Sequence, residues 1–203
     1  VSVVIVGLSN SSKKNKFIYS GNLKKKANNI NAYLIDYRNI IIKGLSKPIS
    51  MLPIMVYGSQ PNDNGNLILS REERNYLIET CPESLKYIKE LVGTEEFLND
   101  SKRWCLIVED EDLEHVKSIP PIKERLDKTK AVREKSNRKE TKELAKTPHR
   151  FGFFSHQNTD SILVPRHSSE RREYIPFGLY NQKKVIADSA LAIYDSDPWL
   201  FSV

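Results

Sequence analysis

Histidine, cysteine and clustered carboxylates are the side chains that most often bind metals or carry catalysis. The four histidines match neither the His-Glu-x-x-His pattern of zinc enzymes nor any other His/Cys metal spacing. Cys81 and Cys105 form no Cys-x-x-Cys pair, so we interpret them as incidental thiols. The sequence therefore predicts no metal site. The histidines are His115, His149, His156 and His167.

Two further groups resemble catalytic sites only in composition. Glu109-Asp110-Glu111-Asp112 is continuous, whereas magnesium sites draw carboxylates from separate elements, so we interpret it as a solvated loop. Ser168 and Ser169 lie beside Glu170, but no general base stands at a recognisable spacing. Neither of the two glycine-rich phosphate-binding patterns, Gly-x-x-x-x-Gly-Lys-Ser/Thr and Gly-x-Gly-x-x-Gly, is present. We predict no catalytic and no cofactor-binding residue.

Residues 147–172 contain side chains suited to recognition. Two apolar runs, 151–154 and 161–165, flank a polar tip and are expected to be paired strands, and an Arg-rich stretch follows. Gln and Asn amides can bond to adenine in the major groove, and Arg to guanine or phosphate. An ordinary hairpin with a polar turn is the alternative. The candidate base-reading residues are His156, Gln157, Asn158, Asp160 and Arg166.

Basic residues cluster in particular segments. Residues 123–150 hold 11 Lys and Arg against five acids, a net +6 that equals the charge of the whole chain. Residues 13–26 hold six Lys and no acid, whereas residues 71–114 carry a net −7 and are expected to face away from nucleic acid. Such clusters are typical of phosphate-binding faces, and a solvated helix surface is the alternative. The candidate contacts to a DNA backbone are Lys128, Arg133, Lys135, Arg138, Lys139, Lys142, Arg150, Ser168, Ser169, Arg171 and Arg172.

The elements that must position these residues are strands and helices in a mixed order. A capping box from Ser70 to Glu73 predicts a helix over 71–79, and Pro82 begins a second helix that ends near Val92, before Gly93. We predict an α+β fold with mixed or antiparallel sheet and a few helices. Strand-like runs lie at residues 1–8, 38–42, 53–57, 66–69, 103–108, 151–154, 161–165, 184–187 and 190–194.

One long basic helix is predicted over about residues 121–145. Apolar positions keep helical spacing for three turns, but none follows between 133 and 143. We expect this second half to be mobile or to be held by something charged, such as a DNA backbone. The spaced positions are Ile122, Leu126, Thr129 and Val132.

The length of 203 residues and 23.4 kDa is ample for a hydrophobic core. The longest apolar run, Val3 to Leu8, is far shorter than the roughly 20 residues that span a bilayer, so we expect no membrane association and a cytoplasmic protein. Residues 9–32 are polar and are predicted to contain a flexible linker. Because both ends are apolar runs, we expect the chain to be part of a longer protein.

One long motif carries a family resemblance. The run Leu163-Val-Pro-Arg-His-Ser-Ser-Glu-Arg-Arg-Glu-Tyr-Ile-Pro-Phe-Gly178 resembles a signature of the target-recognition region in large bacterial N6-adenine DNA methyltransferases. These belong to the type IIL restriction-modification group, in which one polypeptide carries nuclease, methyltransferase and recognition parts. Further similar blocks, in order, are Val3–Gly7, Ser46–Pro48, Met55–Gly65, Leu67–Leu69, Lys86–Ile88, Gly93–Phe97 and Lys102–Leu106.

The resemblance implies a division of the chain and a set of partners. Residues 1–32 would be the end of a methyltransferase domain and a linker, and 33–203 a DNA target-recognition domain. Its partners would be double-stranded DNA and the methyltransferase domain of the same polypeptide. The family's Asn/Asp-Pro-Pro-Tyr/Phe motif is absent, since Pro120-Pro121 is flanked by isoleucines. Catalysis and S-adenosylmethionine would therefore belong to the missing methyltransferase domain, and whether the parent also cleaves DNA stays open.

Other functions remain as alternatives on the residues alone. The same basic charge suits a structure-reading RNA module or a non-specific nucleic-acid-binding module. A purely structural clamp between the nuclease and methyltransferase parts of a larger enzyme is another alternative. A free-standing metal-dependent hydrolase is a further alternative, which a metal-dependent activity of the purified fragment would support. Sequence-dependent DNA binding with a steep salt dependence distinguishes the recognition domain from all of these.

Overall fold

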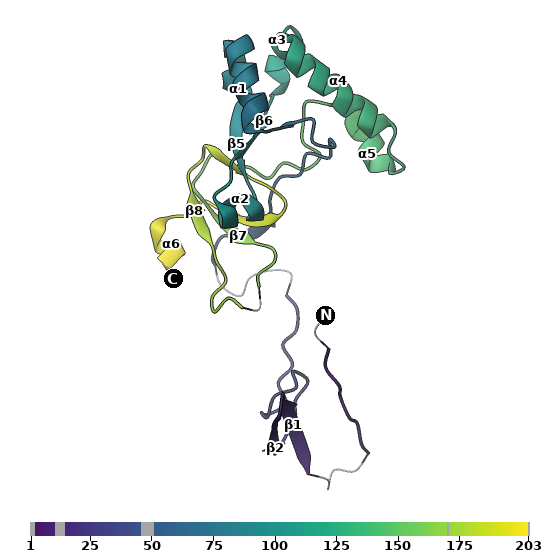
Figure 1. Cartoon of the computed structure of the whole chain (residues 1–203), viewed down its shortest axis with the longest axis vertical. Helices are drawn as coiled ribbons and strands as arrows, with labels where there is room; N and C mark the ends of the chain where they lie inside the picture. Colours follow the sequence, from purple (N-terminus) through teal and green to yellow (C-terminus); the bar gives the residue numbers. More distant parts are fainter. Residues whose placement is uncertain (1–2, 11–14, 46–50, 170, 203) are drawn as a thin grey trace. The chain divides into compact units, whose positions relative to one another are not determined.

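The computed structural model describes residues 3–10, 15–45, 51–169 and 171–202 (Figure 1). The chain divides into two structural units, unit 1 at Val1–Pro48 and unit 2 at Ile49–Val203. The mixed α+β class is as predicted, with antiparallel and mixed sheets and several helices. Among the described residues, no helix has the length and apolarity needed to cross a bilayer.

Unit 1 contains an antiparallel hairpin of β1, Lys16–Ser20, and β2, Leu23–Ala27. Its two-residue turn contains Gly21 with φ of +55°, a conformation that glycine adopts without steric cost. The prediction of a linker through 9–32 is therefore wrong for this segment. The strands expected at 1–8 and 38–42 are also wrong, because the described residues 3–8 and 38–42 form no strand and are exposed. In the described part of the chain, no strand pairs with either run.

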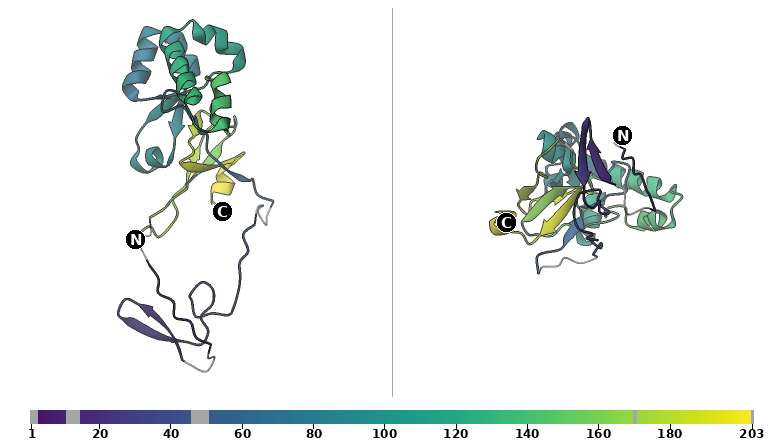
Figure 2. Two further views of the ribbon diagram at one scale, coloured as in Figure 1. Left: turned by 90° about the vertical axis from the view of Figure 1, so that its right-hand side faces the viewer. Right: turned by 90° about the horizontal axis from the view of Figure 1, so that it is seen from below.

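One sheet of unit 2 has the strand order β3-β10-β7-β8 and is antiparallel throughout. The strands are β3, Met55–Tyr57; β7, Ser161–Pro165; β8, Gly178–Tyr180; and β10, Ala190–Tyr194. Figure 2 shows β7 and β8 in green beside the yellow β10. The strands predicted near 53–57, 161–165 and 190–194 are confirmed, whereas 151–154 forms only an isolated bridge between Gln60 and Phe153.

The other sheet of unit 2 has the order β4-β6-β5-β9. Its strands are β4, Ile68–Leu69; β5, Ile88–Val92; β6, Arg103–Leu106; and β9, Lys184–Ile186. The β5–β9 pair is parallel and the others are antiparallel. The two sheets meet where Gly58 follows β3: a Cβ on Gly58 would lie 2.1 Å from the carbonyl oxygen of Ala187, so only glycine fits there.

The first helix, α1 at Arg71–Thr80, has the predicted capping box: the Ser70 hydroxyl accepts the Glu73 amide at 3.2 Å, and Glu73 accepts the Ser70 amide at 2.9 Å. The second predicted helix is wrong. The 3₁₀ helix η1 at Pro82–Tyr87 leads directly into β5, and Gly93 caps the start of α2, Thr94–Asn99, instead of ending a helix.

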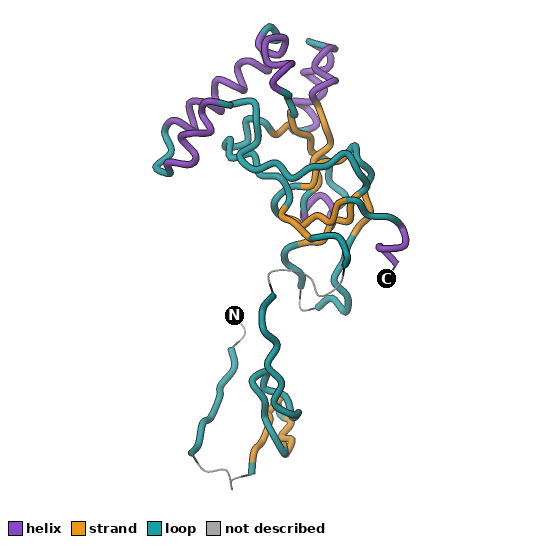
Figure 3. Tube along the Cα trace, turned by 180° about the vertical axis from the view of Figure 1, so that it is seen from behind, coloured by secondary structure: helices purple, strands orange, loops and turns teal. Residues whose placement is uncertain are grey.

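The remaining helical segments are short except for one. They are the 3₁₀ helix η2, Asp110–Asp112; α3, Leu113–Lys117; α4, Pro120–Glu134; α5, Lys139–Glu143; the 3₁₀ helix η3, Leu144–Lys146; and α6, Pro198–Ser202. Figure 3 shows α1, α3, α4 and α5 gathered at one end of unit 2. The single helix predicted over 121–145 is therefore two helices, α4 and α5, separated by a break at 135–138.

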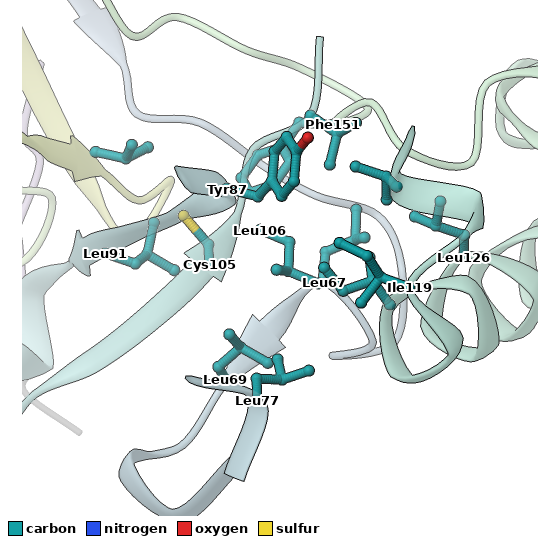
Figure 4. Packing of buried hydrophobic residues seen from close by; sticks show 14 of the residues in the cluster. Leu67, Leu69, Leu77, Tyr87, Leu91, Cys105, Leu106, Ile119, Leu126 and Phe151 are labelled. Carbon is teal, nitrogen blue, oxygen red and sulfur yellow. The ribbon is translucent and has the colours of Figure 1, made fainter. Parts of the chain in front are cut away.

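The main hydrophobic core lies between the β4-β6-β5-β9 sheet and helices α1, α3 and α4 (Figure 4). Leu69 and Leu77 join the sheet to α1, and Leu106 packs in the same cluster as Ile122 and Leu126 of α4. Leu163, Ile186 and Ala192 belong to a second cluster that involves the other sheet. Burial of these apolar side chains in the two clusters stabilises the positions of the sheets and helices that carry the polar candidate residues.

Candidate nucleic-acid interface

Arg133, predicted to contact DNA, is fully buried at the C-terminal end of α4. Its five N–H donors are all used by backbone carbonyl oxygens, so none is left for a phosphate. Burial lowers the pKa of Arg133, and the nearby buried carboxylate of Asp63 opposes this effect. The prediction that Arg133 contacts a DNA backbone is therefore wrong. Nε donates to Asn62 at 3.1 Å, Nη1 to Leu144 and Thr147 at 2.9 Å each, and Nη2 to Pro61 and Arg150 at 2.7 Å each.

Residues 120–150, which contain α4, α5 and η3, are called the helical arm, and the same contacts explain how this arm is held beyond the apolar residues of α4. Arg133 binds the loop at 61–62 and the segment from Leu144 in η3 to Arg150, two stretches that are distant from each other in sequence. We expected this half of the helix to be mobile or to be held by something charged; the group that contacts it in the structure is the arm's own guanidinium, and its partners are main-chain carbonyls.

The other basic candidates of the arm differ in how far their charges are compensated. Lys128 lies 2.7 Å from Glu124 on the same helix face. Arg150 pairs with Asp110, and His149 Nε2 lies 2.7 Å from the same carboxylate. The hydrogen bond from His149 and, to a smaller extent, that from Arg150 lower the pKa of the Asp110 carboxyl. Of the predicted backbone contacts in the arm, those that are exposed and form no ion pair with a described residue are Lys135, Arg138, Lys139 and Lys142, and these are its phosphate candidates.

The polar tip at residues 155–160 is a loop that leads into β7, without the partner strand predicted at 151–154. Its base is fixed by Ser155, whose amide donates to the buried Ser59 hydroxyl at 3.1 Å. Its other end is fixed by the Asp160 carbonyl, which accepts the Ser196 amide at 3.2 Å. Between these anchors, Gln157, Asn158 and the Asp160 side chain are exposed. The structure therefore presents these three candidates together on one anchored loop.

His156 lies at the inner side of the same loop. Its ring contacts Phe154 and Tyr194, with ring centroids 5.9 and 6.4 Å apart, and its Nε2 lies 3.4 Å from Lys89 Nζ. Burial, and secondarily the Lys89 charge, lower the pKa of His156 to about 4. The imidazole is therefore neutral at pH 7, and it can offer a hydrogen bond but no positive charge to a ligand.

Arg166 follows β7 and is exposed. Its guanidinium carbon lies 5.0 Å from the centre of the Tyr57 ring, and Nη1 donates to the Asp188 carbonyl at 3.0 Å. The remaining guanidinium donors bind no other residue in the described part of the chain. Arg166 is thus held by a ring and a carbonyl from two other segments, while part of its hydrogen-bonding edge stays available.

The Arg-rich stretch forms a loop between β7 and β8. The Ser169 hydroxyl accepts the Arg171 amide at 3.2 Å and the Ser169 carbonyl accepts the Arg172 amide at 3.0 Å, which gives a local turn. Ser168, Arg171 and Arg172 are exposed, and neither arginine forms an ion pair with a described residue. The Ser169 hydroxyl is therefore occupied by a local main-chain amide, and the two arginines remain candidates for phosphate contacts.

No cluster of three or more His, Cys, Asp or Glu residues with metal-binding geometry exists among the described residues. The predicted solvated acidic loop is largely η2, in which Asp110 pairs with Arg150, and Asp112 with Lys86 at 2.7 Å. Cys105 is buried, and burial raises the pKa of its thiol to about 12, so it is not a nucleophile at neutral pH.

Sequence reasoning missed three residues around the candidate site: Tyr57, Lys89 and Asp188. Tyr57 and Asp188 hold Arg166, and Lys89 lies against His156. Each is separated from its partner by more than twenty residues, so no local spacing could reveal it. Lys24, Lys25 and Lys26 were also omitted from the candidates, although a lysine-rich segment free of acids was a visible signal.

Three comparisons with known proteins give one result. The chain is 40% identical over 205 residues to "DNA methyltransferase A" of Bacillus subtilis (strain 168), covering all of this chain and 23% of that protein. It is similar to the structure of the Type IIL restriction-modification enzyme MmeI in complex with DNA, with a TM-score of 0.85 and 36% identity over 96% of this chain and 27% of that chain. The chain thus spans about a quarter of each relative.

The third comparison is with family models. The family model described as "MmeI, target recognition domain" matches residues 36–203, which include all of unit 2 and the last part of unit 1. The match agrees with the resemblance noted in the sequence and covers most of the chain. The chain belongs to the family of MmeI target recognition domains.

Proposed function

We propose that this chain recognises a specific sequence in double-stranded DNA, as the target-recognition domain of an S-adenosylmethionine-dependent adenine DNA methyltransferase in a restriction-modification system. The observation that carries the proposal is that one strand of the β3-β10-β7-β8 sheet holds two candidate readers, one at each of its ends. The 155–160 loop leads into β7 and Arg166 follows it, so one strand positions both. Family membership and the similarity to an enzyme solved with DNA support this assignment.

In this proposal the two sets of residues have different tasks. Gln157, Asn158 and Asp160 read base edges, with Arg166 reading guanine or phosphate and His156 acting only through hydrogen bonds. Exposed cations of the arm and of the 166–177 loop hold the phosphates and set the register. They are Lys135, Arg138, Lys139, Lys142, Arg171 and Arg172, together with the exposed Ser168, and with Lys128, Arg150 and Ser169 in weaker roles because their groups already have partners.

We further propose that catalysis and S-adenosylmethionine binding belong to a methyltransferase domain of the parent polypeptide, which would also be this chain's intramolecular partner. The boundary would lie near residue 32, with the recognition domain from 33 to 203. An enzyme that modifies chromosomal DNA in a bacterium works in the cytoplasm, which is the location we propose.

The test is selection of bound duplexes from a randomised pool at low and near-physiological salt, followed by sequencing. The expected result is an enriched motif and a steep loss of affinity with salt. Arg172→Ala is expected to weaken all sequences alike and to flatten the salt slope by about one unit, without altering the motif. Salt-sensitive binding with no motif would overturn sequence recognition by this chain and leave a non-specific clamp. Preference for unpaired RNA would assign it to the RNA-binding class.

A further inference from the structure

The hairpin of unit 1 has two different faces. Register pairs Phe17 with Lys26 and Tyr19 with Lys24, and cross-strand partners share a face, so all four lie on one side. Lys24 Nζ lies 4.2 Å from the centre of the Phe17 ring and 5.8 Å from that of Tyr19. The opposite side carries Lys25 across from Ile18. One face of the hairpin therefore combines two lysines with two aromatic rings.

The positive charge of the described residues 15–45 is not balanced by ion pairs within the described part of the chain. Residues 15–45 contain six Lys and Arg and a single acid, Asp36. The Asp36 carboxylate is engaged by main chain, since it accepts the amides of Asn28 and Asn29 at 3.0 Å each. Within the described part of the chain, no cation of residues 15–45 takes part in an ion pair. The helical arm differs, because several of its cations are paired or buried.

The spacing of the lysines suits a polyanion that runs along the hairpin. Residues two apart on a strand are about 6.5–7 Å apart, which is the scale of successive phosphates along one nucleic-acid strand. Lys24, Lys25 and Lys26 are all exposed, and the apolar stems of Lys24 and Lys26 lie on the aromatic side. The contact between Lys24 and Phe17 restricts the Lys24 side chain before binding, so less side-chain conformational entropy is lost when it binds a phosphate.

We propose that the β1–β2 hairpin is a second phosphate-binding surface, in which Lys24 and Lys26 contact the backbone of duplex DNA. It lies outside unit 2 and therefore adds contacts that are separate from base reading. A two-stranded hairpin alone is only marginally stable in water, so binding of a polyanion would also order it. The inference rests on the proposed function for its ligand, but it concerns affinity and salt dependence alone.

The experiment uses the full 203-residue chain and measures the affinity for a mixed-sequence duplex over a range of salt concentrations. Lys24→Gln/Lys26→Gln is compared with Lys86→Gln/Lys117→Gln, a change of equal charge at lysines paired with Asp112 and Glu114. The hairpin variant is expected to reduce the slope of log affinity against log salt by about two units, and the matched variant by less than about half a unit. Circular dichroism verifies that both variants stay folded.

Three outcomes would overturn the proposal. Equal slopes for the two double variants would show that only overall charge matters. An unchanged slope in Lys24→Gln/Lys26→Gln would show that the hairpin does not contact DNA. A slope change for Lys25→Gln as large as that of either single variant, Lys24→Gln or Lys26→Gln, would contradict the assignment to one face. Pool selection separates this inference from the proposed function, because loss of hairpin contacts is expected to leave the selected motif unchanged.

Discussion

Arg133 Nη2 donates to the carbonyl oxygen of Pro61 at 2.7 Å, across 72 residues of sequence. This contact joins the C-terminal end of α4 to the turn that precedes β4. Because all five N–H donors of the guanidinium are used in this way, a residue that looks like a phosphate ligand is a structural cross-link. The helical arm can therefore present its exposed lysines in a fixed position before any ligand binds.

Arg133→Met is expected to lower the free energy of unfolding by about 3 kcal/mol, since several buried carbonyls lose their donors at once. Urea denaturation measures this change. Lys135→Met, two positions further on and exposed, is the matched control and is expected to change stability by no more than about 0.5 kcal/mol. Equal effects of the two substitutions would contradict the cross-linking role.

The stability of unit 2 is expected to fall as the pH drops from about 6.5 toward 4, because of His156. Its pKa in the folded state is about 4, against an ordinary value near 6.5, so the unfolded chain takes up the proton more readily. Stability is highest above pH 6.5 and falls through this window, and because the ring is partly exposed we expect the loss at pH 5 to be about 1–2 kcal/mol. His156→Gln is expected to show less pH dependence in urea denaturation, and an NMR titration of the ring checks the pKa directly.

Gln157→Ala and Asn158→Ala are each expected to cost about 1–3 kcal/mol of binding free energy at a single base pair of the selected motif. Competition assays with duplexes changed at one position measure this. Gln182→Ala alters an exposed glutamine in the turn between β8 and β9 and serves as the control, with no change expected. A uniform loss over all duplexes would mean that the loop contacts the backbone and does not read bases.

Tyr57 is expected to act through Arg166. The ring holds the guanidinium from one side while the Asp188 carbonyl holds Nη1, so Tyr57→Leu leaves Arg166 free to adopt other rotamers. A double-mutant cycle with Arg166→Ala, measured on the preferred duplex, is expected to give a coupling energy of about 0.5–1 kcal/mol. Additive losses would show that the two side chains contribute independently.

The elements that sequence predicted well are those determined by local chemistry. The Ser70–Glu73 capping box and the apolar spacing of Ile122 and Leu126 depend on residues within a few positions, and both appear as expected. Strands β7 and β10 were also found, because their apolar runs are short and lie between polar segments.

The errors have a common physical origin in contacts made over long sequence distances. Residues 82–92 have the apolar spacing of a helix, but Ile88–Val92 gains hydrogen bonds from β6 on one side and β9 on the other, so tertiary pairing overrides local preference. Arg133 could not be identified as buried, since its five acceptors come from two segments, 61–62 and 144–150, that lie far apart in the sequence. The β1–β2 hairpin was different: the Gly21-Asn22 pair between two strand-like runs was a local signal of a turn.

The order of strands along the chain determines when unit 2 can complete its folding during synthesis. β3 and β7 both pair with β10, and β5 pairs with β9, so neither sheet is complete until the ribosome has made the last strands. The polar loops at 155–160 and 166–177 emerge earlier, while the nascent β3 and β7 still lack their shared neighbour. Unpaired edges of this kind favour association between chains, so a premature stop just before Lys184 would yield an aggregation-prone product rather than a smaller functional domain.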